Sequence, residues 1–284
     1  MNFEDFKKTI IEDKQVDKDD LKEFITLWLK KLPVPTVKVN QKTFIERAVP
    51  ISKEKGEFNL DRLSYIPDDI KEKANEGRFN NAGESIFYAA FTDLDTPEAT
   101  RYFLATELDH SLNSTQNKTF SFTVTKWLST ESFQSIFQLN KKDYCTNKLT
   151  TNALEQILNS DEFKKINKEE IEFFELITEE FAKPDSANKY SITNIVFDFY
   201  KQKGYKSIIY PGVRCKYRGN NIAMLPEIVD KNWTCCFGAE FKLTQTGDDI
   251  EINAVYKINL KQNKLIYSKF GSSEISEKET NIEK

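Results

Sequence analysis

Histidine is nearly absent from this chain, since His110 is the only one among 284 residues. A metal site that takes two or more histidines from one chain is therefore excluded. Catalysis by a Cys–His or Ser–His pair would have to use His110 or not occur. A lone histidine near a helix end is more often a partly exposed residue than a catalyst. We therefore expect neither histidine-based catalysis nor a bound metal.

Cysteines are few, and the common phosphate-binding motifs are missing. Cys145, Cys215, Cys235 and Cys236 show neither metal-binding nor disulfide spacing, and adjacent cysteines on a strand do not readily pair with each other. We expect four free thiols in a reducing, cytoplasmic environment. The sequence contains no Walker loop and no Gly-x-Gly-x-x-Gly fingerprint.

Long apolar runs and an excess of one charge are absent as well. No apolar run approaches the length that spans a bilayer, and the acidic start at residues 1–5 does not resemble a secretory signal. Charged residues make up 30% of the chain and nearly cancel, for a net charge of −4. Nucleic-acid binders usually carry a basic face or tail. We therefore expect no membrane association and no general nucleic-acid binding.

The chain is rich in aromatic and well-patterned segments. Aromatic residues make up 13% and hydrophobic residues 39%, which is enough for a packed core. Apolar residues at helical spacing and short β-rich runs predict an α+β fold. Asp17 or Asp19 can cap the second N-terminal helix, and Pro33 can stop it. Two helices are expected over 2–32 and others over 96–111, 149–183 and 186–203; strands are expected over 36–49, 85–91, 120–125, 207–210, 221–225, 233–243, 250–260 and 264–269.

The segment from Gly77 to Tyr88, with the sequence GRFNNAGESIFY, is the most informative. Arg78 lies in a loop bounded by glycines, which let a backbone approach a ligand closely. Its planar guanidinium suits phosphate oxygens, and the strand that follows delivers Tyr88. On local evidence alone, an arginine in such a loop is more often structural.

Two further segments carry candidate site residues. Arg47 lies in an apolar β segment, where an arginine must find a partner or line a cleft. A structural pair with a carboxylate is the alternative. Later in the chain, a strand ends at Tyr210-Pro211-Gly212 and Asn221 follows. This turn could shape the rim of a pocket or be an ordinary strand exit.

Taken in order, these segments resemble the RES domain family, which is named for Arg, Glu and Ser and includes toxins of toxin–antitoxin pairs. The likeness covers about residues 44–230 and rests on Arg47, 77–83, Phe87-Tyr88, Tyr210-Pro211 and 220–223. It implies a mixed sheet core like that of ADP-ribosyltransferases. It also implies cleavage of NAD⁺ at the nicotinamide–ribose bond.

On this reading the chain divides into four parts. Residues 1–35 form an N-terminal helical extension, and 36–232 form the RES-like core. Residues 233–271 form a C-terminal antiparallel β meander packed on that core, and 272–284 form a disordered tail.

The resemblance also implies roles for individual residues. Arg47 and Arg78 match the two arginines of the family, and Tyr88 matches its tyrosine. Glu107 is the preferred catalytic carboxylate over Glu98, because acids favour the first turn of a helix for structural reasons. The expected catalytic set is Glu107, Arg78 and Tyr88, and the set expected to bind NAD⁺, the substrate, is Arg47, Arg78, Tyr88, Gly212 and Asn221.

One residue departs from the family pattern. The family has a serine after Tyr-Pro, where this chain has Gly212, and Ser207 lies five residues too early to be assumed a replacement. Three functions therefore stay open. The first is an NAD⁺ glycohydrolase or ADP-ribosyltransferase that acts as a toxin or defence effector. The second is a nucleotide-binding or regulatory module, and the third is an interaction scaffold built on the N-terminal helices and the region 149–183. An antitoxin protein and a second copy of the chain are the partners considered.

Overall fold

One large sheet organises the molecule. The computed structural model describes residues 1–51, 63–92, 96–109, 112, 117–138, 148–183, 190–212, 219–247, 249–261 and 264–269. These residues form ten strands in the order β1-β5-β6-β7-β3-β2-β4-β8-β9-β10. Neighbouring strands pair antiparallel except β5 and β6, which are parallel. The α+β prediction is confirmed, with a mostly antiparallel sheet.

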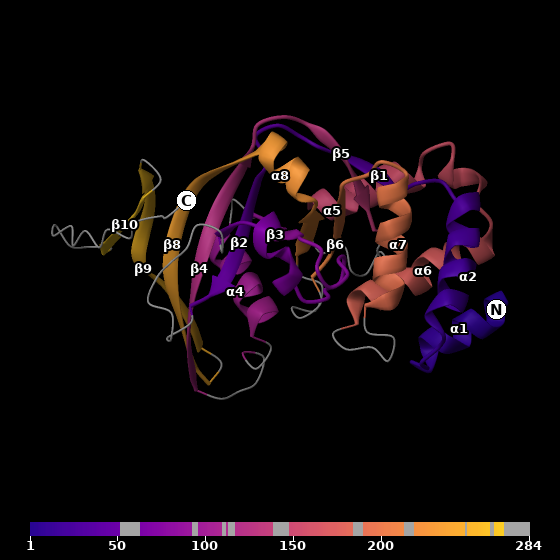
Figure 1. The fold of residues 1–284 in the computed structure, drawn as a ribbon, viewed down its shortest axis with the longest axis horizontal. Helices are drawn as coiled ribbons and strands as arrows, with labels where there is room; N and C mark the ends of the chain where they lie inside the picture. Colours follow the sequence, from indigo (N-terminus) through magenta and orange to yellow (C-terminus); the bar gives the residue numbers. More distant parts are fainter. Residues whose placement is uncertain are drawn as a thin grey trace.

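The strands are β1 Thr36–Val39, β2 Phe44–Pro50, β3 Phe87–Phe91, β4 Lys118–Ser129, β5 Phe133–Phe137, β6 Ser207–Pro211, β7 Asn220–Met224, β8 Trp233–Thr246, β9 Asp249–Lys261 and β10 Lys264–Lys269. The helices are α1 Phe3–Ile11, α2 Lys18–Lys31, α4 Pro97–Leu108, α5 Lys148–Leu158, α6 Lys168–Ala182, α7 Ser191–Gln202 and α8 Pro226–Asn232, with 3₁₀ turns at Asp68–Lys73 and Phe163–Lys165. Figure 1 shows α1, α2, α6 and α7 gathered at one end of the molecule and β8–β10 at the other.

The N-terminal helices belong to the helical end of the core. Asp17 caps α2, because its carboxylate accepts hydrogen bonds from the backbone N–H groups of Asp19 and Asp20 at 2.9 and 3.2 Å, as expected for an N-cap. Leu21 and Ile25 of α2 are fully buried, and α2 packs against α7. The sequence prediction of two packed helices, with Asp17 as a cap, is confirmed.

The three C-terminal strands are also confirmed, and they continue the sheet. β8 pairs with β4 over almost the full length of both strands, and β9 and β10 follow in antiparallel order. Phe122 of β4 and Phe241 of β8 stack at 5.9 Å between ring centroids. The meander is thus joined edge to edge with the core through backbone hydrogen bonds.

Some elements differ from the sequence prediction. The strand β5 and the short helix α8 were not predicted. In β4, polar residues alternate with Phe122 and Val124, a pattern typical of a half-buried strand, yet Thr123 and Thr125 are fully buried. Thr125 Oγ1 accepts a hydrogen bond from Trp127 Nε1 at 2.9 Å and donates one to the Leu63 carbonyl at 3.3 Å. A satisfied hydroxyl can be buried at little cost, so alternation alone could not reveal that both faces are covered.

Several predictions fall outside the described residues: His110, Cys145, Cys215, the turn at 262–263 and the tail at 272–284. None of the helices in the described ranges is both long and apolar enough to cross a membrane.

Candidate functional site

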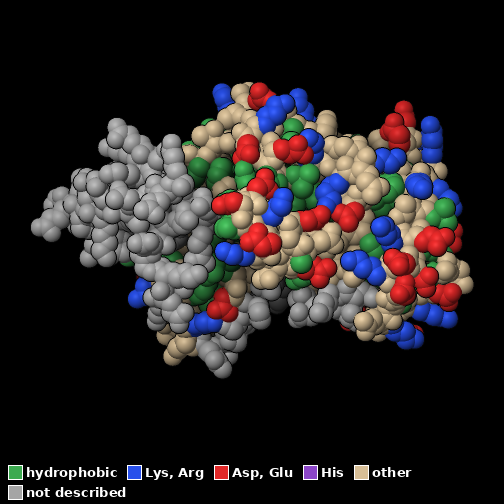
Figure 2. Space-filling model, in the orientation of Figure 1, with side chains coloured by type: hydrophobic (Ala, Val, Ile, Leu, Met, Phe, Trp, Pro, Cys, Tyr) green, Lys and Arg blue, Asp and Glu red, His purple; other side chains and the backbone are tan. Residues whose placement is uncertain are grey.

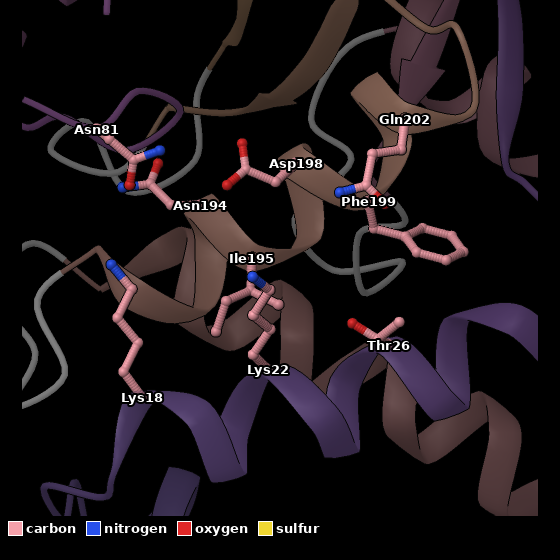
Figure 3. Close-up of a pocket in the computed structure, with 9 residues that line it drawn as sticks. All are labelled: Lys18, Lys22, Thr26, Asn81, Asn194, Ile195, Asp198, Phe199 and Gln202. Carbon is pink, nitrogen blue, oxygen red and sulfur yellow. The ribbon is translucent and has the colours of Figure 1, made fainter. Parts of the chain in front are cut away.

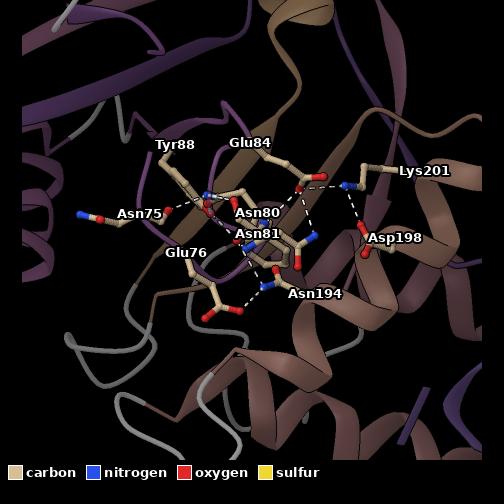
Figure 4. Close-up of polar contacts among 10 residues, drawn as sticks. Asn75, Glu76, Asn80, Asn81, Glu84, Tyr88, Asn194, Asp198 and Lys201 are labelled. Atoms are coloured by element: carbon tan, nitrogen blue, oxygen red, sulfur yellow. Dashed lines mark hydrogen bonds and ion pairs between the residues drawn. The ribbon is translucent and has the colours of Figure 1, made fainter. Parts of the chain in front are cut away.

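Tyr88 ties the glycine-bounded loop to the sheet. Its hydroxyl donates a hydrogen bond to Asn80 Oδ1 at 2.8 Å and accepts one from the Phe79 backbone N–H at 3.0 Å. Burial raises the pKa of Tyr88 above its ordinary value. The phenol therefore stays protonated and donates its hydrogen bond to Asn80. The loop is therefore held in one shape by a side chain of β3 (Figure 4).

Gly77 is required for this close approach. A Cβ at position 77 would lie 2.5 Å from Asn80 Oδ1 and 3.0 Å from Tyr88 Oη. The backbone N–H of Gly77 also donates to the Asn80 carbonyl at 2.9 Å. The sequence suggested that the glycines of this loop let a ligand approach the backbone. At Gly77, the close approach is instead made by Asn80 and Tyr88 of the protein itself.

Phe79 anchors the loop in the core. It is 1% exposed, and its ring centroid lies 4.5 Å from that of Tyr210, 5.2 Å from Phe181 of α6 and 5.6 Å from Phe197 of α7. Such aromatic clusters bury a large apolar area. The loop is consequently a rigid platform between the sheet and the helices.

Arg78 binds the end of α6. Its Nη1 donates to the carbonyls of Phe181 at 2.7 Å and Glu180 at 3.3 Å, and its Nη2 donates to the carbonyl of Lys183 at 3.0 Å. Carbonyls at the C-terminal end of a helix lack partners in a following turn. The guanidinium binds those of Phe181 and of the C-cap residue Lys183, and it shares the Glu180 carbonyl with the Lys183 N–H. Much of the hydrogen-bonding capacity of Arg78 therefore serves the fold, although its charge lies near Tyr88 and Tyr210.

Glu107 and Tyr210 lie far apart in the sequence but interact electrostatically. Burial raises the pKa of Tyr210 well above its ordinary value, and Tyr88 and Glu107 raise it further, whereas Arg78 lowers it. Glu107 of α4 is half-buried. By contrast, Glu98 has a side chain that is 69% exposed, and it lies 3.8 Å from Arg101. Of the two carboxylates considered, Glu107 is the one whose charge acts on Tyr210.

Asn221 lies in register with this group. It pairs with Tyr210 of β6 and with Ala90 of β3, and it is 6% exposed. Directly paired residues share a face of the sheet, and Tyr88 shares it too because it lies two residues before Ala90. Tyr88, Tyr210 and Asn221 therefore line one face.

Arg47 points to the opposite face. Its guanidinium lies over the ring of Phe87, 5.3 Å from the centroid, and Phe87 and Tyr88 alternate on β3. Its Nη1 donates to the Tyr88 carbonyl at 3.0 Å, while its Nε has no hydrogen-bond partner among the described residues. Burial lowers the pKa of Arg47 to about 10. Arg47 thus contacts the site through the backbone of Tyr88.

Gly212 sits against Phe103 of α4. A Cβ at position 212 would lie 2.0 and 2.3 Å from the ring atoms Cε2 and Cζ of Phe103. The Gly212 N–H donates to the Gly219 carbonyl at 3.0 Å, so the turn passes close to the ring. The space that a serine side chain would need is occupied by an aromatic ring.

Sequence reasoning missed three residues of this region. The ring centroid of Tyr190 lies 5.5 Å from Arg78 Cζ. Asn80 links Tyr88 to α7 through hydrogen bonds, and the ring of Phe103 packs against Gly212. Asn194 Nδ2 of α7 donates to the Asn80 carbonyl at 3.3 Å. Asn80 was in the quoted loop without a role, and no local pattern marks Tyr190 or Phe103, since their positions depend on how α4 and α7 pack.

The cysteines and carboxylates show no metal site within the described ranges, where no group of three or more metal-binding side chains occurs. Cys235 and Cys236 are free. Burial raises the pKa of Cys235 to about 11, which keeps its thiol protonated and weakly nucleophilic at neutral pH.

Chemically, Tyr88, Tyr210 and Asn221 offer two phenols and an amide on one face of the sheet, and the charges of Glu107 and Arg78 act on Tyr210. No protein-family model matches the chain, and no curated protein matches its sequence. Any functional assignment therefore rests on the residues themselves.

Proposed function

We propose that this chain is a RES-type protein that binds NAD⁺ and cleaves it at the nicotinamide–ribose bond, on a core like that of ADP-ribosyltransferases. The observation that carries the proposal is that the charges of Glu107 and Arg78 both act on Tyr210, which shares a face of the sheet with Tyr88. Glu107, Arg78 and Tyr88 come from α4, the glycine-bounded loop and β3. Tyr88 and Tyr210 share one face of the sheet, and this supports a site formed by residues that resemble the family's catalytic set.

In the proposed reaction, Glu107 carries the chemistry. The C1′–N1 bond breaks, and its electron pair leaves with neutral nicotinamide. A nearby carboxylate stabilises the positive charge that develops on the ribose and can hold a ribose hydroxyl. Water, or an acceptor group in the transferase case, then adds at C1′ and releases a proton.

The other residues hold the dinucleotide. Arg78 supplies positive charge next to Tyr88 and Tyr210, which suits the pyrophosphate. Tyr88 and Tyr210 offer aromatic faces for the nicotinamide, and Asn221 offers an amide beside them. Arg47 acts as a positioning residue through the Tyr88 carbonyl. Holding the reacting groups in place is worth several kcal/mol in reactions of this type.

The test is release of free nicotinamide from NAD⁺ by the purified chain. We expect turnover by the wild type and a loss of at least about a hundredfold in Glu107→Gln, in line with the removal of one charge-stabilising group. Glu98→Gln is the matched control, because Glu98 lies on the same helix with an exposed side chain. No turnover by the wild type, or full turnover by Glu107→Gln, contradicts the proposal.

A second candidate is a nucleotide-binding module that does not cleave, and the contact between Gly212 and Phe103 favours it. Calorimetry with NAD⁺ separates the two candidates: saturable binding without nicotinamide release supports the module, and rapid turnover rules it out. In either case we propose a cytoplasmic protein whose site an antitoxin could cover, as in the family that the chain resembles. Gel filtration against size standards tests whether the chain forms a homo-oligomer.

A further inference from the structure

A cavity lies between α2 and α7, outside the candidate NAD⁺ site. Its volume is about 270 Å³, and it is lined by side chains of both helices and by Asn81 of the glycine-bounded loop. Figure 3 shows Lys18 and Lys22 rising from α2 toward the side chains of Asn194 and Asp198 on α7. Figure 2 shows acidic and basic side chains interspersed across one face of the molecule. The two lysines at the cavity are therefore not part of a larger basic patch on that face.

The two lysines supply positive charge without a fixed partner. Lys18 and Lys22 are one helical turn apart on α2 and are exposed, so their ammonium groups reach the same opening. Neither forms an ion pair with a described residue. Lysine ammonium groups bind phosphate and carboxylate oxygens as point charges.

The acidic group of the cavity, Asp198, already has a lysine partner on its own helix. Asp198 Oδ1 lies 2.6 Å from Lys201 Nζ, and Lys201 Nζ also lies 3.3 Å from Glu84 Oε2. Glu84 in turn accepts hydrogen bonds from the N–H and side-chain amide of Asn81 at 3.0 and 3.2 Å. Figure 4 shows Lys201 between Asp198 and Glu84. The charges of Lys18 and Lys22 are left for something that enters the cavity.

Asn194 adds an unused acceptor. It is 2% exposed, and its Nδ2 is directed to the Asn80 carbonyl and to Glu76 Oε1 at 3.3 and 3.5 Å. Its Oδ1 accepts no hydrogen bond from the described residues. A buried polar atom without a partner costs free energy. Because protein atoms enclose this oxygen, a donor in the cavity reaches it only when the Asn194 side chain turns toward the cavity.

We propose that this cavity is a second binding site, for a small ligand that carries a phosphate or carboxylate group and a nearby hydroxyl or amine. The anion lies against Lys18 and Lys22, and the donor binds Asn194 Oδ1 once that side chain turns toward the cavity. Ile195 and Phe199 provide an apolar wall for the carbon skeleton. A phosphorylated polyol has this chemistry and suits the size of the cavity. The inference does not depend on the NAD⁺ chemistry.

Calorimetric titration of the full chain, without NAD⁺ and at constant ionic strength, tests it with two probes. Inorganic phosphate reports the anion subsite, and glycerol 3-phosphate reports the anion and hydroxyl together. We expect saturable binding of both, with glycerol 3-phosphate bound about tenfold more tightly, as for one added hydrogen bond.

Three variants locate the binding. Lys18→Gln and Lys22→Gln should each weaken glycerol 3-phosphate binding at least about tenfold, as for the loss of one charge-assisted hydrogen bond. Lys30→Gln makes the same change on the same helix away from the cavity and should leave binding unchanged. Absence of saturable binding, equal affinity for the two probes, or an equal loss in Lys30→Gln overturns the proposal. Because these lysines are exposed, the variants should fold, and circular dichroism verifies this.

Discussion

The ring of Phe103 fills the space beside Gly212, where a Cβ would come within 2.0 Å of Cε2. This contact joins α4, which carries Glu107, to the turn after β6, which carries Tyr210. The RES family, which we propose for this chain, has a serine at that turn. In this molecule the glycine and the phenylalanine form a matched pair, and changing one affects the space of the other.

Gly212→Ser and Gly212→Ala should both destabilise the fold. The clash involves Cβ itself, so we expect losses of about 1–3 kcal/mol from overpacking for either variant, measured by urea denaturation. Phe103→Leu removes the two ring atoms that collide, Cε2 and Cζ. The double variant Phe103→Leu/Gly212→Ser should therefore lose less than the sum of its single variants. Strict additivity would show that the two residues do not compete for the same space.

Arg78→Lys should loosen the C-terminal end of α6. An ammonium group cannot reproduce the planar fork that binds the carbonyls of Phe181, Glu180 and Lys183, so we expect a loss of about 1–3 kcal/mol. Hydrogen exchange should be faster in the segment that follows Phe181. Arg47→Lys is the comparison, since Arg47 binds a carbonyl of β3, and it should leave the exchange of α6 unchanged. Equal effects of the two variants would contradict this assignment.

The sequence predicted the helices and strands best where one local signal decided them. Asp17 caps α2 because its side chain reaches the N–H groups of the first turn, a contact that depends on neighbours in sequence. β5 was missed because the five residues of Phe133–Phe137 are placed by β1 and β6, which lie far away along the chain.

The candidate site could be predicted in part for the same reason. The motif from Gly77 to Tyr88 is contiguous, so its residues are near one another in any fold. The face on which Arg47 lies depends on the register between β2 and β3, where Glu46 pairs with Ala90. A shift of one residue reverses the faces. The bonds of Arg78 to α6 span more than one hundred residues, which no local pattern contains.

Tyr88→Phe should release the glycine-bounded loop without disturbing the core. The change removes the hydroxyl that serves Asn80 and Phe79 and leaves the buried Phe79 backbone N–H without its partner. We expect a loss of about 1–3 kcal/mol in unfolding free energy and faster hydrogen exchange at Phe79. Tyr205→Phe removes the hydroxyl of a half-buried tyrosine outside the loop and should be close to neutral. An unchanged exchange rate at Phe79 in Tyr88→Phe would contradict the role given to the hydroxyl.

Glu46→Gln should change how stability depends on pH. Glu46 is 1% exposed in β2, and burial raises its pKa although Arg101 opposes the shift. The folded state therefore holds this proton more tightly than the unfolded chain does, and stability falls as the pH rises from the ordinary carboxyl pKa through the raised value. Glutamine cannot ionise, so the stability of Glu46→Gln relative to wild type should increase across that window and then level off. Urea midpoints between pH 4 and pH 8 measure the difference. Glu98→Gln alters the exposed carboxylate beside the same Arg101, and its stability should depend on pH in the same way as that of the wild type. If the pH dependence of Glu46→Gln also matches the wild type, burial of the Glu46 charge does not govern it.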